Sequence, residues 1–275
     1  MTRADISAGL GLCRANRWNQ LEDDWRTFLE SPRGGGVVAT KTGAVVGTVT
    51  FIRYDHLSWI AMMLVEQQER GAGIGSQLLR EALGALKNEP CVGLDATPAG
   101  EPMYRRHGFV EGYGLARMKA AIESRCFQTT AERVRLMNVG DLPHVFERDR
   151  KAFGADRAML LASLYTRAPQ CAWIARNDDG VLGYCFGRPG YLYNQLGPIV
   201  ADREETAREL TARCLREHDG KPFVIDAPRH APEWLAWLRS VGFIEERPLL
   251  RMYLGRHEPR GVPSSHFGIA GPEFG

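Results

Sequence analysis

The sequence predicts two α/β domains in tandem, each a twisted mixed β-sheet flanked by helices. Three observations predict this fold class. The chain has 275 residues, whereas one ordinary domain takes about 100–200. Strand-like runs of β-branched residues alternate with segments of helical periodicity along the chain. Landmarks of the first half also recur in the second half, in the same order and at matching spacings.

The composition excludes several classes of protein and partner. Hydrophobic residues make up 44% of the chain and charged residues 25%, which excludes a disordered protein. Lys and Arg total 35 against 33 for Asp and Glu, and a net charge of +2 favours neither nucleic acid nor a membrane surface as partner. Apolar runs stay far below the ~20 residues of a transmembrane helix, and the N-terminus lacks a signal-peptide pattern. We therefore expect a cytoplasmic protein.

The cysteines show no spacing typical of a metal or redox site. They occur without a C-x-x-C pair or an adjacent His cluster, at Cys13, Cys91, Cys126, Cys171, Cys185 and Cys214. Close spacing is the usual sign of zinc ligands and redox pairs. The sequence therefore predicts free thiols in a reducing compartment and no metal site.

In the first half, helices and strands follow from their periodicities. Leu21, Trp25 and Phe28 at helical spacing predict a helix over 8–30, ended by the Pro and Gly residues of 31–36. Short and then longer β-branched runs predict strands at 37–39 and 44–53, and a continuous apolar run predicts a buried strand at 56–65. The remaining expected elements are a leucine-faced helix after Gly75, a strand at 91–95, a helix at 99–107, and strands at 108–111 and 115–118.

The second half repeats this layout. Its expected elements are a strand at 134–137, a helix at 141–165, hairpin strands at 171–176 and 181–186, a strand at 195–200, a helix at 204–217, a strand at 223–226, a helix at 232–239, and two strands within 243–255. We therefore predict domains at 1–118 and 132–255, joined by a polar linker at 119–131. The Gly, Pro and Ser of 256–275 predict an irregular C-terminal tail, which either docks between the domains or stays loose.

Four pairs of landmarks carry the internal repeat. They are Val45-Val46-Gly47 with Val181-Leu182-Gly183, Val65 with Val200, Gly108-Phe109 with Gly242-Phe243, and Arg117-Met118 with Arg251-Met252. The spacings agree to within one residue between the halves. Such agreement favours one fold written twice over two unrelated α/β domains.

A glycine-rich loop lies between the buried strand at 56–65 and the helix that follows. It reads Arg70-Gly71-Ala72-Gly73-Ile74-Gly75. Glycines let backbone N–H groups face a ligand, and a helix N-terminus adds partial positive charge, so the loop suits a phosphate or pyrophosphate. A tight turn that binds nothing is the alternative. A P-loop is disfavoured because no lysine follows Gly75, and Ser76 breaks the dinucleotide fingerprint.

Two motifs give the chain a resemblance to a known family. Val65-x4-Arg70-Gly71-x-Gly73-Ile74-Gly75 resembles the acetyl-CoA motif of the GNAT superfamily of N-acetyltransferases, Arg/Gln-x-x-Gly-x-Gly/Ala. The stretch Tyr104-Arg105-Arg106-His107-Gly108-Phe109 resembles the family's Tyr-x-x-x-Gly-Phe element. The order of elements also agrees. The resemblance covers 1–118 directly and 132–255 only through the repeat.

The resemblance implies acetyl-CoA as cosubstrate and assigns roles to particular residues. The backbone of Met63, Leu64 and Val65 would pair with the pantetheine arm. The pyrophosphate would lie on Arg70, Gly71, Ala72, Gly73, Ile74, Gly75 and Ser76. Tyr104 would protonate the leaving thiolate. Thr97 stands where many members have an asparagine that positions CoA.

The resemblance also implies that the segment between the first two strands lines the acceptor pocket, and assigns this role to the stretch that holds Trp18 to Trp25. Candidate acceptor residues are Trp18, Asn19, Asp24, Trp25 and Asp95, because aromatic rings beside carboxylates suit a cationic amine. The alternative is a helix with Trp facing the core and acids facing water. Many members carry a glutamate base on the buried strand, which is absent here. Asp24 and Asp95 are possible substitutes for it.

The second half lacks both chemical elements. Residues 201–208, at the position of the glycine loop, contain acids and no glycine, and Leu238 stands where the tyrosine would be. The resemblance therefore implies a degenerate second copy. We expect an acetyl-CoA-dependent N-acetyltransferase that acts on a small-molecule amine in its first domain. The alternatives are a non-enzymatic acyl-CoA sensor and a protein N-acetyltransferase.

Overall fold

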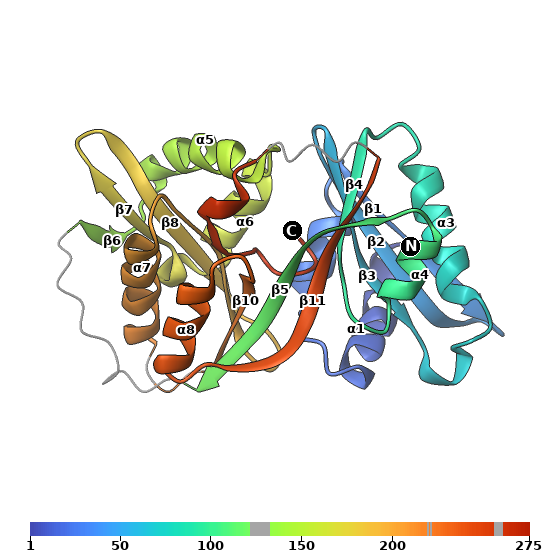
Figure 1. The fold of residues 1–275 in the computed structure, drawn as a ribbon. Coiled ribbons are helices and arrows are strands. Elements are labelled where there is room, and N and C mark those ends of the chain that lie inside the picture. The colour runs from blue at the N-terminus through green and yellow to red at the C-terminus, as the bar shows by residue number, and fades with distance from the viewer. Residues whose placement is uncertain (122–132, 219, 221, 256–260) are drawn as a thin grey trace.

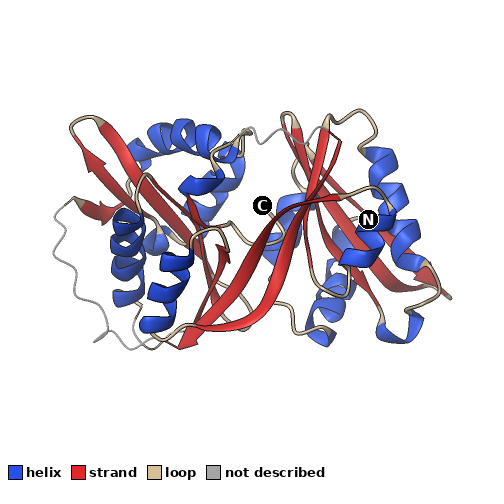
Figure 2. Ribbon diagram, in the orientation of Figure 1, coloured by secondary structure: helices blue, strands red, loops and turns tan. Residues whose placement is uncertain are grey.

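The computed structural model describes residues 1–121, 133–218, 220, 222–255 and 261–275. In these residues the strands form one mixed sheet, with the order β1-β2-β3-β4-β11-β5-β10-β9-β8-β7-β6 and with β12 paired to β9. Helices cover the sheet in two lobes that the strands β5 and β11 connect (Figure 1, Figure 2). The expected α/β class with a mixed sheet is confirmed.

The first half contains the elements that surround the glycine loop. They are α1 (Ile6–Ala15), α2 (Glu22–Leu29), β1 (Gly34–Lys41), β2 (Ala44–Tyr54), β3 (Leu57–Val65), α3 (Ile74–Ala85), β4 (Cys91–Ala96), α4 (Glu101–Arg106) and β5 (Val110–Ala121). One core cluster packs α3 and α4 onto β2, β3 and β4.

The second half repeats this order. Its elements are β6 (Val134–Leu136), α5 (Leu142–Phe153), α6 (Ala158–Arg167), β7 (Trp173–Asn177), β8 (Gly180–Arg188), β9 (Asn194–Ala201), α7 (Glu204–Arg216), β10 (Pro222–Pro228), α8 (Pro232–Ser240), β11 (Ile244–Gly255) and β12 (His266–Gly268). A second core cluster lies under α7 and α8, and a third joins α1 and α2 to α5 and α6 across the two halves.

Two helices predicted as single are each divided in the structure. The expected helix at 8–30 is α1 and α2, with Arg17 in a left-handed turn (φ 54°) and Asp24 accepting from Leu21 N at 2.8 Å to begin α2. The expected helix at 141–165 is α5 and α6, separated at Gly154 (φ 84°). Residues 34–36, predicted to end the helix, belong to β1 because they pair with β2 from Gly34 onward.

The closing strands of the two halves are exchanged. Each half was predicted to end in two short strands of its own, but the structure has one long strand in each place, β5 and β11. β5 leaves the first half and pairs antiparallel with β10, while β11 leaves the second half and pairs antiparallel with β4. The two strands also pair with each other, as Figure 1 shows where the green and orange ribbons cross between the lobes.

Two buried ion pairs hold the exchanged strands. Arg117 of β5 lies directly opposite Asp226 of β10 and donates to both carboxylate oxygens at 2.7 and 2.8 Å. Arg251 of β11 lies directly opposite Asp95 of β4 and donates to both oxygens at 2.8 Å. These arginines are the matched pair of the sequence repeat. Each guanidinium therefore neutralises a carboxylate of the other half in a nearly dry environment.

Part of the predicted linker lies within β5. Residues 119–121 continue that strand, and 122–131 lie outside the described residues. The domain boundaries at 118 and 132 stay a prediction.

The prediction of an irregular C-terminal tail is corrected. Residues 263–265 form a short 3-10 helix and β12 follows, pairing with β9. β9 and β10 pair only through Asn194–Phe223 and Gln195–Val224 and then separate, so β12 and Ile269 fill the gap between them. Phe274 stacks on Phe28 at 5.2 Å between ring centroids. Composition predicted an irregular tail and left open whether it docks or stays loose. In the structure these apolar side chains bury the described part of the segment.

Breaking one exchange pair should destabilise the whole fold. Arg117→Met leaves the Asp226 carboxylate buried and unpaired, so we expect a loss of about 3–5 kcal/mol in the free energy of unfolding. The double variant Arg117→Met/Asp226→Leu should recover most of this loss. Urea unfolding followed by circular dichroism measures both. Lys151→Met, in the exposed pair with Glu147, is the control and should hardly move the midpoint. A single variant as stable as the wild type would contradict the role of the pair.

Candidate active site

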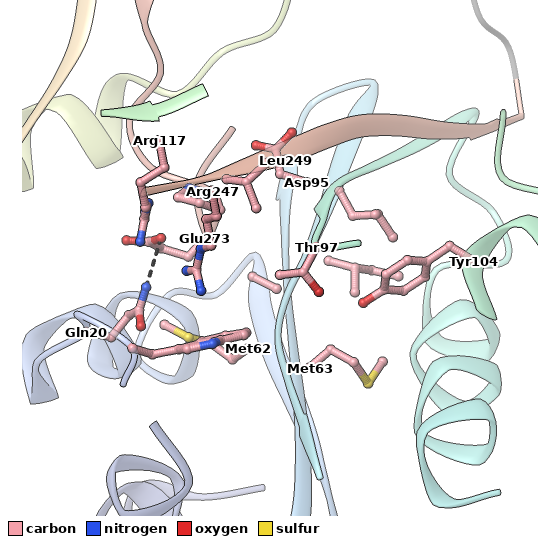
Figure 3. A pocket seen from close by; sticks show the side chains of 15 residues that line it. Gln20, Met62, Met63, Asp95, Thr97, Tyr104, Arg117, Arg247, Leu249 and Glu273 are labelled. Atoms are coloured by element: carbon pink, nitrogen blue, oxygen red, sulfur yellow. Dashed lines mark hydrogen bonds between the residues drawn. The ribbon is translucent and has the colours of Figure 1, made fainter. Parts of the chain in front are cut away.

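A pocket opens where β3 and β4 separate. These parallel strands pair only through Ser58–Val92 and Trp59–Gly93, and beyond that point the backbones diverge. The pocket encloses about 490 Å³, part of it open to solvent. Its lining from the first half includes Trp18, Met63, Asp95, Thr97, Tyr104 and Arg117, and the second half contributes Arg247, Leu249, Pro272 and Glu273. Figure 3 shows Tyr104 and Met63 at one end and Arg117, Gln20 and Glu273 at the other.

A β-bulge in β3 shapes the pocket floor. Thr48 pairs with Leu64 and Thr50 with Ala61, so Met62 and Met63 together oppose a single residue of β2. Met62 adopts a left-handed backbone (φ 48°), and its carbonyl accepts from Thr48 Oγ1 at 2.8 Å. A bulge interrupts the ladder and re-aims side chains. Sequence patterns did not indicate it, because methionine carries no turn signal.

The glycine loop forms an open cradle of backbone donors. Gly71 (φ 85°) and Gly73 (φ 81°) lie in the left-handed region, and a Cβ at either would meet no atom within 4 Å. Within the described residues, the backbone N–H groups of 71–76 donate to no acceptor. The guanidinium of Arg70 is held by two other groups, since it donates to Asn16 Oδ1 at 2.5 Å and to the Val65 carbonyl at 3.2 Å. The cradle therefore offers backbone donors and a helix N-terminus to an anion.

Tyr104 extends from α4 into the pocket. Its ring packs edge-on against Phe109, with 5.8 Å between centroids. Burial raises the pKa of the Tyr104 hydroxyl above its ordinary value, so the phenol keeps its proton at neutral pH. Thr97 precedes α4, and its hydroxyl accepts from Gly100 N at 3.3 Å. Both residues line the pocket, as the resemblance implied, and their roles stay predictions.

Both carboxylates that line the pocket are bound to arginines. Asp95 accepts twice from Arg251, as described above. Glu273 pairs with Arg188, and its second oxygen accepts from Gln20 Nε2 at 3.1 Å. Among the described lining residues, neither carboxylate is therefore a free proton acceptor.

Only part of the predicted acceptor set reaches the pocket. Trp18 and Asp95 line it. Trp25 is buried in the core, and Asp24 pairs with Arg167 and Arg188. Asn19 binds the second half: its Oδ1 accepts from the backbone N–H of residues 192 and 193, and its Nδ2 donates to the carbonyl of 193. We therefore do not carry Asn19, Asp24 and Trp25 into the acceptor site.

The pocket residues from the second half were missed by sequence reasoning. Arg247 and Leu249 arrive on the exchanged strand β11, and Pro272 and Glu273 arrive on the C-terminal segment. Spacing within one half cannot indicate that its last strand crosses into the other. The internal repeat was the available signal, but it is equally compatible with closing strands that pair within their own halves.

Among its described residues, the second half has neither the glycine cradle nor the tyrosine at the matching positions. Asp202 and Glu204 lie where the glycine cradle would be and pair with Arg148 and Arg208. Leu238, at the tyrosine position, is buried in the core. β12 lies along β9 in the gap that corresponds to the pocket. In the second half, a segment of the chain therefore fills the gap that forms the pocket in the first half.

A buried sulfur and imidazole cluster lies in the core of the second half. The ligand atoms of Cys171, Cys214 and His218 lie within 4.8 Å of one another, with Cys171 Sγ 3.4 Å from His218 Nε2. The sequence predicted no metal site and did not bring these residues together, because Cys171 lies 43 residues before Cys214, although His218 follows Cys214 by four. None of them lines the pocket. Cys126 lies outside the described residues.

A search for membrane-spanning helices gives a negative result for the described residues. None of their helices combines the length and the apolar character needed to cross a bilayer.

Comparisons with known proteins agree on one family. Two family models, each described as an acetyltransferase (GNAT) domain, match residues 32–111 and 145–268. Holothin acyltransferase of Pseudoalteromonas sp. (strain SANK 73390) is 26% identical over 263 residues, which cover 95% of this chain and 88% of that protein. The uncharacterized N-acetyltransferase YitH of Bacillus subtilis (strain 168) is 24% identical over 254 residues, covering 89% and 87%.

Solved structures share the fold. A putative acetyltransferase from Pyrococcus horikoshii has a TM-score of 0.82 and 21% identity, covering 100% of this chain and 94% of its own. A tandem GNAT protein from the clavulanic acid biosynthesis pathway has a TM-score of 0.64 and 13% identity, covering 92% and 96%. At these identities the likeness concerns the fold alone.

Asn19 should act as a structural tie between the halves. Asn19→Ala removes the acceptor of two backbone N–H groups, so we expect a loss of about 1–3 kcal/mol in the free energy of unfolding. Hydrogen exchange should quicken at residues 192 and 193 specifically. Asn88→Ala, at an exposed position after α3, is the matched control. Unchanged exchange at 192 and 193 would contradict the tie.

Proposed function

The chain belongs to the GNAT family of acetyltransferases, and we propose that it transfers the acetyl group of acetyl-CoA to a small-molecule amine in the pocket of its first half. The proposal rests on two features that lie side by side, a cradle of backbone donors and a buried phenol. An open cradle of unpartnered N–H groups at 71–76 lies beside a pocket that holds a protonated, buried phenol. The second half offers no such combination among its described residues.

The residues present fit acetyl-CoA. GNAT enzymes generally use an acyl-CoA, and the cradle presents donors and a helix N-terminus where a pyrophosphate requires them. The open space at Gly71 and Gly73 lets phosphate oxygens approach the backbone. The diverging backbones of β3 and β4 leave Met63 to Val65 without a partner strand on that side, so they can pair with the amides of the pantetheine arm. When bound, acetyl-CoA supplies the acetyl group as a thioester that an amine can attack.

Tyr104 holds the proton that the departing thiolate needs. Its buried hydroxyl remains protonated at neutral pH and faces the end of the pocket near Met63 (Figure 3). A positioned acid of this kind contributes to the rate as sulfur charge develops. The amine itself must arrive uncharged, because the lining carboxylates Asp95 and Glu273 are committed to arginines.

The walls of the pocket favour a small acceptor. Trp18 lines one side, and Pro272 and Glu273 line another, so residues of both halves border the space. A protein acetyltransferase would need a groove open along its length for a peptide. A pocket bordered by both halves supports a metabolite-sized amine instead. Incubating the protein with acetyl-CoA and an amine panel, followed by mass spectrometry of the products, tests this directly.

Acetyl-CoA should bind at one site per chain, in the glycine cradle. Gly73→Asp places a carboxylate where the pyrophosphate would lie, so we expect acetyl-CoA affinity to fall by at least about tenfold from charge repulsion. Gly43→Asp is the matched control, because Gly43 has the same left-handed backbone (φ 83°) and equally open surroundings. Isothermal titration calorimetry gives both affinity and stoichiometry. Undetectable binding to the wild type at millimolar acetyl-CoA would refute the proposed function.

Tyr104→Phe should separate chemistry from binding. Removing the hydroxyl deletes the proton donor while keeping the ring, so kcat should fall by about two orders of magnitude. The dissociation constant of acetyl-CoA should stay within about twofold, since the cradle donors are untouched. Tyr165→Phe, on α6 and outside the pocket, is the control. Turnover equal to that of the wild type would remove Tyr104 from this role.

A further inference from the structure

Arg247 enters the pocket from a bulge in the exchanged strand β11. Glu245 pairs with Met118 and Arg247 with Arg117, so Glu246 is an extra residue in β11. The bulge separates two side chains of opposite charge. Glu246 pairs with Lys119 on the outside, whereas Arg247 lines the pocket, as Figure 3 shows. The backbone thus aims this guanidinium at the space where an acceptor would lie.

Arg247 differs from the other charged residues of the pocket. Arg117 is neutralised by Asp226, Asp95 by Arg251, and Glu273 by Arg188. Arg247 forms no ion pair or side-chain hydrogen bond with any residue that the structure describes, and its Nε is buried without an acceptor. Burial and the nearby charge of Arg117 lower the pKa of Arg247, while the charges of Asp226 and Glu246 act in the opposite direction. Among the described residues that line the pocket, Arg247 is therefore the one charged side chain that no counterion contacts directly.

A partly desolvated guanidinium without a partner is unfavourable unless a ligand supplies a negatively charged hydrogen-bond acceptor. Burying a charged donor without an acceptor costs free energy, and a carboxylate recovers that cost by accepting two parallel hydrogen bonds. Such pairs are stronger inside a pocket than at an exposed surface. A phosphate, with nearly two charges, would call for a second free cation, and the neighbouring Arg117 is already neutralised.

We propose that Arg247 forms an anion subsite of the acceptor pocket, and that the acceptor is an amine that also bears a carboxylate. This inference rests on the proposed function, because it names the substrate class of the same site. Arg247 binds the carboxylate, and the amine extends toward the end of the pocket formed by Tyr104 and Met63. Two-point recognition of this kind orients the nucleophile as well as selecting it.

Matched pairs of acceptors test the subsite. The probes are glycine, β-alanine and 4-aminobutyrate, each beside its carboxamide, with rates compared at equal concentrations of uncharged amine. We expect the wild type to favour at least one acid over its amide by about ten- to hundredfold in kcat/KM. Arg247→Met should bring that ratio to about one, mainly through KM, and Arg247→Lys should keep part of it. Arg203→Met, at an exposed position without a side-chain partner among the described residues, should leave the ratio unchanged.

Stability and direct binding give readouts independent of turnover. A structural arginine would destabilise the fold when removed. Because Arg247 has no hydrogen-bond or ion-pair partner among the described residues, Arg247→Met should keep or raise the urea midpoint. The same acids should bind the wild type without acetyl-CoA in calorimetry, and bind Arg247→Met at least about tenfold more weakly. O-Phosphoethanolamine should be a poorer ligand than β-alanine.

The outcomes separate this inference from the proposed function. Equal use of acids and amides, a ratio unaffected by Arg247→Met, a preference for O-phosphoethanolamine, or no binding of any acid overturns the carboxylate subsite. The acetyltransferase proposal survives each of these results if acetyl-CoA binds and amines are acetylated. Conversely, loss of acetyl-CoA binding refutes the reaction, while acid binding through Arg247 is still measured on its own.

Discussion

Arg117 and Arg251 each donate two hydrogen bonds to an aspartate of the opposite half, and these two pairs hold the exchanged strands β5 and β11 in place. Both pairs lie in the sheet interior, where an unpartnered charge would be strongly destabilising. Each pair therefore ties the closing strand of one half to a strand of the other half. Through these exchanged strands the two halves form one continuous sheet.

The exchange determines which residues meet in the pocket. β11 runs beside β4, and Leu249 and Arg247 of the second half line the same pocket as Thr97 and Met63 of the first. The cradle and the phenol belong to the first half, whereas the second half supplies one wall and, among the described lining residues, the charged side chain without a directly bound counterion. A half that has lost its own glycine loop and tyrosine thus still contributes to the site. The second half therefore contributes both to the sheet and to the lining of the pocket.

Local sequence patterns predicted the glycine loop and Tyr104, whereas the other pocket residues depend on how the strands are connected. The glycine loop and Tyr104 could be found because each motif is contiguous and its chemistry depends on a few neighbouring residues. Arg247 could not, because its place depends on a strand crossing between halves and on a bulge at Glu246. Asp24 was expected near an amine, yet it caps α2 and pairs with two arginines of the second half. Helical spacing indicated which residues share a face, but not which distant arginines that face would meet.

The C-terminal segment contacts the gap between diverging strands in both halves. In the second half, β12 lies along β9 and fills this gap, which is therefore closed by the chain itself. A few residues later, the Pro272 carbonyl accepts from Trp59 Nε1 at 2.9 Å, and Glu273 lines the pocket of the first half. The gap that receives a strand in the second half is thus left open in the first, beside backbone N–H groups that have no acceptor among the described residues. The two copies therefore differ less in the sheet than in what occupies the gap, which is a segment of the chain in one half and an open pocket in the other.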